Sequence, residues 1–303
     1  MLPSGERGFG KAMSALPTKR AYRPENLAEA LAIRAESSVT PVAGGTDLMV
    51  KRRHWSGIPR FQQPALFISH LHELKGVSVV NAGSDQGQDL RIGAACTFAT
   101  LLEDARVPNS LAAAIRGIGG PAIKNAATLG GNICNASPAG DTLPILYALG
   151  SSVELASNRA SRNVPIEEFI TGPGTTILAR DELLVNVTVP MLSFDTSVYR
   201  KVGTRRANAL SKLSFVGLAR RGGSTILDFR VAFGSVAPTV IRCRDIEITI
   251  AGQPIEALPS LATATKRAYA ELIRPIDDQR STARYREVTA LRLLDHFLTQ
   301  LQE

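Results

Sequence analysis

The sequence predicts an α+β fold built from three subdomains. Up to about residue 190, segments with apolar residues at helical spacing alternate with short strand-like runs. After Pro190 the strand-like runs are separated by glycine turns, which is typical of antiparallel hairpins, and from Leu261 the pattern is helical. A chain of 303 residues is long enough for two or three such units with their own cores.

The first subdomain is expected over residues 18–80. Pro24 precedes a run with apolar residues at helical spacing, which predicts a helix over residues 25–36. A short strand then leads into a glycine turn and a resumed apolar run within residues 38–50. A buried strand over Ala65–Ser69 and a short helix follow, so this order predicts a small parallel or mixed sheet.

The second subdomain is expected over residues 81–190, after the polar stretch 81–89. Its first strand runs up to Thr97, which we expect to cap a helix. A second helix is expected to end at Gly119, Gly120 and Pro121. The remaining elements are a helix and strand followed by three strand-like runs, at residues 143–157, 164–170, 175–180 and 182–190.

The third subdomain is expected over residues 191–303. It begins with four strand-like segments separated by turns, at residues 197–203, 210–223, 224–236 and 246–255. A final helix then places five apolar residues on one face, namely Val288, Leu291, Leu294, Phe297 and Leu298. Residues 1–17 lack the apolar core of a secretory signal and are expected to form a flexible basic extension.

Composition argues against two classes of protein. The net charge is +8, but the basic residues are scattered and aromatic residues make up only 5% of the chain, so a nucleic-acid-binding stripe is not indicated. An anionic cofactor and acidic partner surfaces explain this charge as well. No apolar run reaches 18 residues, and we therefore expect no membrane span.

The cysteines and histidines indicate neither a disulfide framework nor a metal site. Cys96, Cys134 and Cys243 lie far apart without a C-x-x-C pair, which fits a reducing, cytoplasmic setting and too few thiolates for an iron–sulfur cluster. We interpret all three as small buried apolar residues. His70 and His72 lack a third ligand, and no histidine is assigned a catalytic role.

The most informative segment is the glycine-rich stretch 127–144. Adjacent glycines let a backbone approach a ligand closely, and successive free N–H groups in such a turn can form an anion site. Thr128 and Asn132 add side-chain donors. Asp141 could accept from a ribose or ring N–H, or alternatively cap the helix that begins near Leu143.

A second glycine pair, Gly44–Gly45, follows a strand and precedes Thr46 and Asp47. Wrapping a pyrophosphate with backbone N–H groups fits this pattern, although an ordinary surface turn fits it as well. The spacing is neither G-x-G-x-x-G nor G-x-x-x-x-G-K-[ST], which disfavours a Rossmann site and a P-loop. Two such loops together suggest a large phosphate-bearing cofactor held from two sides.

The chain resembles the flavin-binding subunits of the molybdenum hydroxylases, the family of xanthine dehydrogenase and carbon monoxide dehydrogenase. The resemblance is greatest to the separate bacterial xanthine dehydrogenase type of FAD subunit and runs from about residue 18 to the C-terminus. It is carried by AGGTDL, LRIGAACTF, IGGPAIKNAATLGGNICNASPAGDTLP, the TGPG turn, DELLVNVTVP, FGSVAPTVIRC and the terminal IDDQRSTARYREVTALRLL. It implies a PCMH-type, vanillyl-alcohol-oxidase-like FAD-binding domain over residues 18–190 and a CO-dehydrogenase-flavoprotein-like domain over residues 191–303.

The resemblance also implies which residues bind FAD. The first loop would wrap the pyrophosphate through Thr40, Pro41, Val42, Ala43, Gly44, Gly45, Thr46 and Asp47. The second segment would contribute Ala127, Thr128, Leu129, Gly130, Gly131 and Asn132, with Asp141 near the adenosine or ribitol portion. Ile118 would lie beside the isoalloxazine, and Leu183 or Leu184 would pack on the cofactor.

Lys201 matches a basic position near the flavin, where a cation would stabilise the negative charge of reduction. The alternative is a solvated lysine among neighbouring arginines. The resemblance further implies partner chains, because the cysteine sets for [2Fe–2S] clusters and the molybdopterin region reside on other subunits of this family. Electrons would pass from a small [2Fe–2S] subunit, itself supplied by a large molybdopterin subunit, through FAD to NAD⁺ or another acceptor.

Two other functions are left open by the sequence. One is a stand-alone FAD oxidoreductase with its own substrate, which would need a substrate pocket and a general base. The other is a flavin-binding or basic interaction module without redox turnover. The substrate of the whole enzyme cannot be predicted from this chain.

Overall fold

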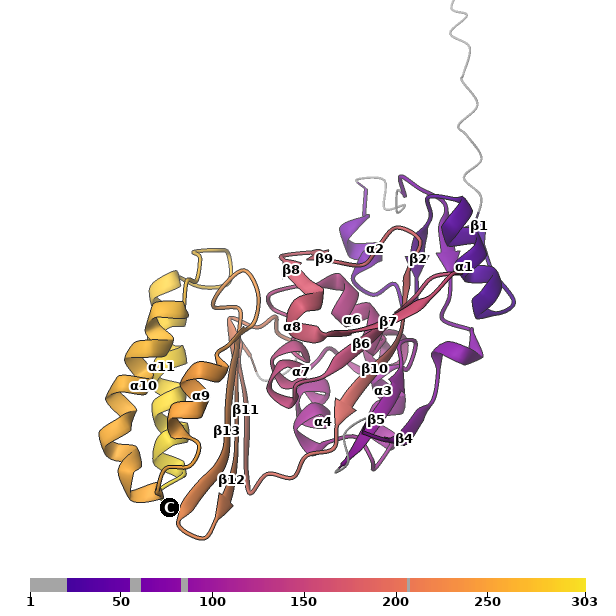
Figure 1. Ribbon diagram of the computed structural model, residues 1–303. Helices are drawn as coiled ribbons and strands as arrows, with labels where there is room; N and C mark the ends of the chain where they lie inside the picture. Colours follow the sequence, from indigo (N-terminus) through magenta and orange to yellow (C-terminus); the bar gives the residue numbers. More distant parts are fainter. Residues whose placement is uncertain (1–20, 55–60, 83–86, 206–207) are drawn as a thin grey trace, which may run out of the picture.

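The computed structural model describes residues 21–54, 61–82, 87–205 and 208–303, so the extension expected over residues 1–17 lies outside the described chain. Figure 1 shows three parts side by side. The indigo N-terminal part lies at one end, the magenta middle part lies between, and the orange and yellow C-terminal part lies at the other end.

The N-terminal part contains a three-stranded parallel sheet, as the sequence predicts. Its strands lie in the order β1 (Ala21–Tyr22), β3 (Ala65–Phe67) and β2 (Thr40–Val42). Helix α1 (Leu27–Glu36) begins at Asn26, whose side chain accepts a hydrogen bond from the N–H of Glu29. Two short elements complete this part, α2 (Leu48–Lys51) and the 3₁₀ turn η1 (His72–Leu74).

The middle part is built on a five-stranded antiparallel sheet. Its strands lie in the order β4 (Val77–Asn81), β5 (Gln88–Gly93), β10 (Leu183–Pro190), β6 (Ser152–Ala156) and β7 (Ser161–Pro165). Leu90, Ile92, Val187 and Val189 alternate into the core, while the residues between them face outward.

Helices cover the buried face of this sheet (Figure 1). They are α3 (Phe98–Glu103), α4 (Asn109–Arg116), α5 (Pro121–Ala126), α6 (Leu129–Asn135), α7 (Leu143–Leu149) and α8 (Ile166–Phe169). Thr97 caps α3 by accepting from the N–H of Thr100, as expected. A small hairpin of β8 (Ile170–Gly172) and β9 (Thr175–Thr176) turns at Gly174, whose φ is +71°.

The C-terminal part contains a four-stranded antiparallel sheet. Its strands lie in the order β11 (Thr196–Val202), β12 (Leu213–Gly222), β13 (Thr225–Gly234) and β14 (Ile241–Arg242). One face packs on α9 (Arg244–Ile250), α10 (Leu258–Leu272) and α11 (Ala283–Gln300). The short turn η2 (Ile255–Ala257) lies between α9 and α10 in the sequence. The other face lies against α7 and α4, so residues 213–219 of β12 are buried on both sides.

Three predicted elements differ from the structure. Residues 246–255 were expected to form a strand, but α9 occupies the first half of this segment. Residues 164–170 contain the helical turn α8 instead of a continuous strand. In both segments β-branched and aromatic residues favour a strand, whereas packing of the apolar face onto a sheet favours a helix. The predicted end at Pro121 is the start of α5, since α4 already ends at Arg116.

The final helix largely follows the predicted face. Leu294, Phe297 and Leu298 of α11 are buried, while Val288 and Leu291 are half-buried. Across the described ranges, no helix is both long enough and apolar enough to span a membrane.

Candidate cofactor-binding site

The structure brings the two glycine segments into direct backbone contact. A Cβ atom on Gly44 would lie 1.8 Å from the carbonyl oxygen of Ala126 and 2.5 Å from its carbonyl carbon. Only glycine permits so close an approach of the two chains. The loop after β2 therefore lies against the residues that lead into α6.

A polar contact joins the same two segments. The ammonium of Lys51, at the end of α2, donates to the side-chain oxygen of Asn135 at the end of α6. It also forms an ion pair with Asp47 at 3.1 Å. Both side chains of that pair are half-exposed, so the ion pair contributes little to stability. We infer that it helps to align the two segments.

The first loop has backbone donors available for a ligand. Within the described chain, the N–H groups of Gly44, Gly45, Thr46 and Asp47 donate no hydrogen bond. Gly45 has a φ of +69°, which turns the backbone here. Gly44 to Thr46 are half-buried. Adjacent unpaired amides in a turn form a concave site that suits a phosphate.

The second segment is not the open turn that was predicted. It forms the helix α6, which begins at Thr128, and the hydroxyl of Thr128 accepts from the N–H of Gly131 at 3.1 Å. The N–H of Gly130 donates to the carbonyl of Ala94 at 2.9 Å, and that of Asn132 donates to the carbonyl of Thr128. These amides are therefore already paired, because a threonine before two glycines here starts a helix.

Exposure divides the residues of this segment into two groups. Ala127, Thr128, Leu129 and Gly130 are buried, and a Cβ on Gly130 would lie 2.6 Å from the Cβ of Ala94. Gly131 is exposed and Asn132 is half-buried, with its side-chain oxygen accepting from Thr142 at 2.6 Å. Gly131 and the Asn132 amide nitrogen are therefore the parts of the segment that a cofactor can reach.

Asp141 does not cap the following helix. The N-cap of α7 is Thr142, and the Asp141 carboxylate instead forms an ion pair with Lys201 at 2.7 Å. Side chains of both residues are largely buried, with 9% and 14% of their surface exposed. The alternative of a solvated Lys201 is therefore wrong, because strand β11 places this lysine against the middle part.

Lys201 also reaches the segment that carries Ile118. Its ammonium donates to the carbonyl oxygen of Gly117 at 2.9 Å. Ile118 is half-buried at the edge of the middle core. The structure thus brings Asp141 and Lys201 together beside the backbone of Gly117, the residue before Ile118, although the three segments are far apart in the sequence.

Leu183 and Leu184 lie elsewhere in the packing. They are 2% and 5% exposed and point into two different cores, that of the N-terminal part and that of the middle part. Successive residues of a strand face opposite sides, which explains this division. The protein itself covers both side chains almost completely.

Two residues of this site, Tyr199 and Ser211, were not predicted from the sequence. The hydroxyl of Ser211 donates to Asp141, and the hydroxyl of Tyr199 lies 3.5 Å from the same carboxylate oxygen. Burial and the neighbouring Asp141 raise the pKa of Tyr199. Tyr199 could have been found, because it lies two residues before Lys201 in a strand and so shares its face. Ser211 lies beyond a loop and could not.

The remaining candidate groups have ordinary structural roles. A ring nitrogen of His70 lies 2.7 Å from the carbonyl oxygen of Pro24. Burial raises the pKa of the Cys134 thiol to about 12 and also raises that of Cys96. Among the described residues, no three histidine, cysteine or acidic side chains gather as metal ligands.

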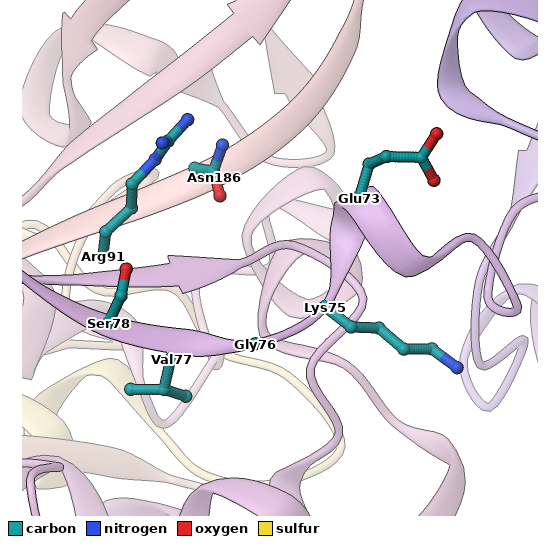
Figure 2. Close-up of a pocket in the computed structure, with 7 residues that line it drawn as sticks. All are labelled: Glu73, Lys75, Gly76, Val77, Ser78, Arg91 and Asn186. Atoms are coloured by element: carbon teal, nitrogen blue, oxygen red, sulfur yellow. The ribbon is translucent and has the colours of Figure 1, made fainter.

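A separate hollow of about 260 Å³ lies on the outer face of the middle sheet. Figure 2 shows Ser78, Arg91 and Asn186 on three neighbouring strands, with Glu73 and Lys75 at the preceding turn. Arg91 and Asn186 both donate to Glu154, at 2.7 and 2.9 Å. These two side chains are thus held by Glu154, and the hollow shares no lining residue with the glycine segments.

Two family models together cover nearly the whole chain. The FAD binding domain in molybdopterin dehydrogenase matches residues 16–192, and the CO dehydrogenase flavoprotein C-terminal domain matches residues 198–301. This chain belongs to the molybdopterin dehydrogenase FAD-binding family. It is an oxidoreductase subunit, and its cofactor is FAD, as the resemblance in the sequence implied.

Relatives of this FAD-binding subunit include subunits named for two different enzymes. The chain is 35% identical over 240 residues to the xanthine dehydrogenase FAD-binding subunit of Escherichia coli O157:H7, covering 77% of this chain and 80% of that protein. It is 27% identical over 280 residues to the carbon monoxide dehydrogenase medium chain of Hydrogenophaga pseudoflava, covering 89% and 92%.

Solved structures confirm the predicted fold class. Carbon monoxide dehydrogenase from Hydrogenophaga pseudoflava, in a form that lacks the Mo-pyranopterin moiety, matches with a TM-score of 0.80 at 24% identity over 93% of this chain and 96% of that chain. Quinoline 2-oxidoreductase from Pseudomonas putida 86 matches with a TM-score of 0.81 at 20% identity, over 94% and 97%. The α+β architecture of a PCMH-type domain followed by a C-terminal domain is therefore shared with these proteins.

Proposed function

We propose that this FAD-binding subunit holds the pyrophosphate of FAD on the N–H groups of residues 44–47. The contact of Gly44 with Ala126 carries this proposal, because it closes the loop against the segment that leads into α6, while the loop amides donate to no acceptor among the described residues. The remainder of the cofactor would extend past Gly131 and Asn132. Its isoalloxazine would lie beside Ile118 and Lys201.

The chain contributes binding, position and charge. When bound, FAD supplies the redox chemistry, accepting and releasing two electrons. Gly44 to Asp47 would neutralise phosphate charge through backbone dipoles. Ile118 would provide an apolar surface that excludes water on one side. Lys201 would place a cation where negative charge develops on reduction, in a partly buried setting that weakens solvent screening.

The proposal also includes the route by which electrons reach and leave the FAD. The relatives are named as FAD-binding subunits and medium chains, which supports a multi-chain enzyme here. We infer that a small [2Fe–2S] subunit delivers electrons to FAD and that a large molybdopterin subunit oxidises the substrate. NAD⁺ is the acceptor we propose.

Reoxidation of the assembled complex tests this function. The complex would be purified with its native partners, reduced anaerobically with a stoichiometric amount of dithionite, and mixed with NAD⁺. Recovery of the visible flavin absorbance with matching formation of NADH is expected. A complex without flavin would contradict FAD binding, whereas bound flavin that stays reduced would contradict only NAD⁺ as the acceptor.

A stand-alone oxidoreductase makes a different prediction. The isolated chain would then reduce its own flavin when given a small-molecule substrate. We expect flavin reduction only when the [2Fe–2S] partner is present, and stopped-flow absorbance of the chain with and without that partner distinguishes the two cases.

A further inference from the structure

The Asp141 carboxylate, in the middle part, accepts hydrogen bonds from the C-terminal part. Asp141 itself lies in the middle part, directly before α7, and is 8% exposed. Three donors reach it from the C-terminal part. Lys201 contacts one oxygen at 2.7 Å, while Ser211 and Tyr199 share the other oxygen. Three donors from one part thus converge on a single buried carboxylate of the other.

The Lys201 ammonium is only partly satisfied by these contacts. It carries three N–H donors, and two of them reach Asp141 and the carbonyl of Gly117. Within the described chain, no acceptor takes the third. A largely buried ammonium with an unused donor points to a ligand, and its contact with the Gly117 carbonyl puts it next in sequence to Ile118, where the proposed flavin ring would lie.

The ion pair is close to neutral as a unit. The electrostatic potential that it creates nearby therefore depends on how fully other groups stabilise the Asp141 charge. Ser211 is 1% exposed and Tyr199 is largely buried, so water contributes little to that stabilisation. The two hydroxyl groups are the remaining contributors among the described residues.

We propose that Ser211 and Tyr199 are positioning residues that act on the flavin through Asp141 and Lys201. They hold the carboxylate and share its charge, and Asp141 holds the Lys201 ammonium with one donor left for the cofactor. Together the four residues set the reduction potential of the flavin and connect the C-terminal part to it. This inference rests on the proposed position of FAD.

The proposal predicts shifts of opposite sign. Asp141→Asn leaves the Lys201 cation uncompensated, so reduction becomes more favourable and the flavin potential rises. Lys201→Met leaves the carboxylate uncompensated, and the potential falls. We expect about a ten-fold change in the reduction equilibrium for each, which is about 30 mV for a two-electron couple. The double variant should return close to the wild-type value.

Ser211→Ala and Tyr199→Phe should shift the potential in the same direction as Lys201→Met but by less. Each removes one donor from the carboxylate and leaves more of its negative charge near the flavin. A change on the order of three-fold in the reduction equilibrium is expected, in line with one lost hydrogen bond.

Ser214→Ala is the matched control. Ser214 is a fully buried serine at the start of β12, three positions beyond Ser211, and its hydroxyl has no hydrogen-bond partner among the described residues. The same substitution at this site removes a hydroxyl without touching Asp141. We expect unchanged flavin content and potential.

The experiment is a spectroelectrochemical titration of the flavin in the assembled complex, with FAD content measured after denaturation. The ordered shifts above, with Ser214→Ala unchanged, would support the proposal. If FAD is bound in full but Ser211→Ala and Tyr199→Phe match the control, the positioning role is wrong while the FAD site stands. If the wild-type complex binds no FAD, the proposed function itself fails.

Discussion

Gly44 carries the closest backbone contact of the site. An alanine there would put its Cβ 1.8 Å from the carbonyl oxygen of Ala126, and backbone cannot move aside as a flexible side chain can. We expect Gly44→Ala to lower the free energy of unfolding by at least about 1–3 kcal/mol, the usual range for overpacking. It should also lower FAD content strongly, because the two glycine segments would separate.

Gly87→Ala is the control for this substitution. A Cβ on Gly87 would lie 3.7 Å from that of Ala82, an ordinary contact. Chemical denaturation and the amount of FAD released from each purified variant measure the two effects. Equal FAD content in Gly44→Ala and the wild type would show that the contact between the segments is not needed for binding.

The ionised carboxylate of Asp278 makes the stability of the protein depend on pH in the acid range. The hydrogen bond from Arg286, together with the N–H groups of Arg280 and Ser281, lowers the pKa of Asp278 from 3.8 to about 2. A carboxyl group with a lowered folded-state pKa stabilises the protein above its unfolded-state pKa. That contribution is lost as the pH falls through the folded value.

We therefore expect Asp278→Asn to be less stable than the wild type at neutral pH, since it removes the charge that pairs with the buried Arg286. The difference should shrink between about pH 4 and pH 2. Urea midpoints of both proteins measured across this range test the prediction. A difference that stays constant with pH would contradict it.

At the scale of elements, the start of α6 depends on one side chain. Thr128 is 2% exposed and its hydroxyl accepts from the N–H of Gly131. Thr128→Ala should cost about 0.5–2 kcal/mol of unfolding free energy, the usual range for a lost N-cap. Thr128→Ser keeps the accepting oxygen and should cost clearly less. If both variants lose the same stability in urea denaturation, the hydroxyl is not the stabilising group.

Arg242 in β14 connects the C-terminal part to the middle part. Its side chain is 4% exposed and forms ion pairs with Glu247 of α9 at 3.0 Å and Glu167 of α8 at 3.2 Å. It also donates to the carbonyl of Tyr147 in α7. Arg242→Met leaves Glu247 buried and unpaired, so we expect a loss of about 3–5 kcal/mol.

Arg244→Met is the comparison for that variant. Arg244 contacts the same Glu167 at 3.0 Å, but its side chain is 60% exposed, so we expect about 0–1 kcal/mol. Adding Glu247→Gln to Arg242→Met should recover part of the loss, because it removes the unpaired charge. Guanidinium denaturation of these variants gives the values, and equal costs for the two arginines would contradict the argument from burial.

The sequence predicts the elements whose own pattern decides their structure. The helix after Pro24, the Thr97 cap and the strand 182–190 with its alternating core residues follow from local periodicity. Residues 246–250 do not, because β-branched residues favour a strand while Glu247 is held in α9 by Arg242 of the preceding strand. Such tertiary contacts cannot be read from the segment itself.

Some features of the site can likewise be predicted from local sequence patterns, and others cannot. Spacing predicts the glycine pairs, but it also predicts Thr128 to be a donor in an open turn, whereas Thr128 caps a helix. The ion pair between Asp141 and Lys201 joins residues 60 positions apart, and Ser211 lies 70 positions from Asp141. Their meeting depends on how the C-terminal sheet packs against α7 and α4, which no local pattern encodes.

At the scale of the whole molecule, the proposed cofactor site takes residues from all three parts. The first loop comes from the N-terminal part, α6 and Asp141 from the middle part, and Lys201 from the C-terminal part (Figure 1). The division into residues 18–80, 81–190 and 191–303 stays a prediction. Residues of β10 already contribute to the core of the N-terminal part, so the first two units share packing.

This arrangement suits a subunit that exchanges electrons with other chains. In the proposed site each part would contribute residues to the cofactor, so a change in the relative position of the parts would alter FAD binding and flavin charge together. We therefore expect mutations at the Arg242 contact to weaken FAD retention as well as stability.

A structure of the FAD-loaded subunit, by crystallography or by electron microscopy of the assembled complex, tests the central claim most directly. We predict pyrophosphate density against the N–H groups of Gly44 to Asp47, with the isoalloxazine beside Ile118 and the ammonium of Lys201. FAD bound with its pyrophosphate away from this loop, or with its ring remote from Lys201, would contradict it.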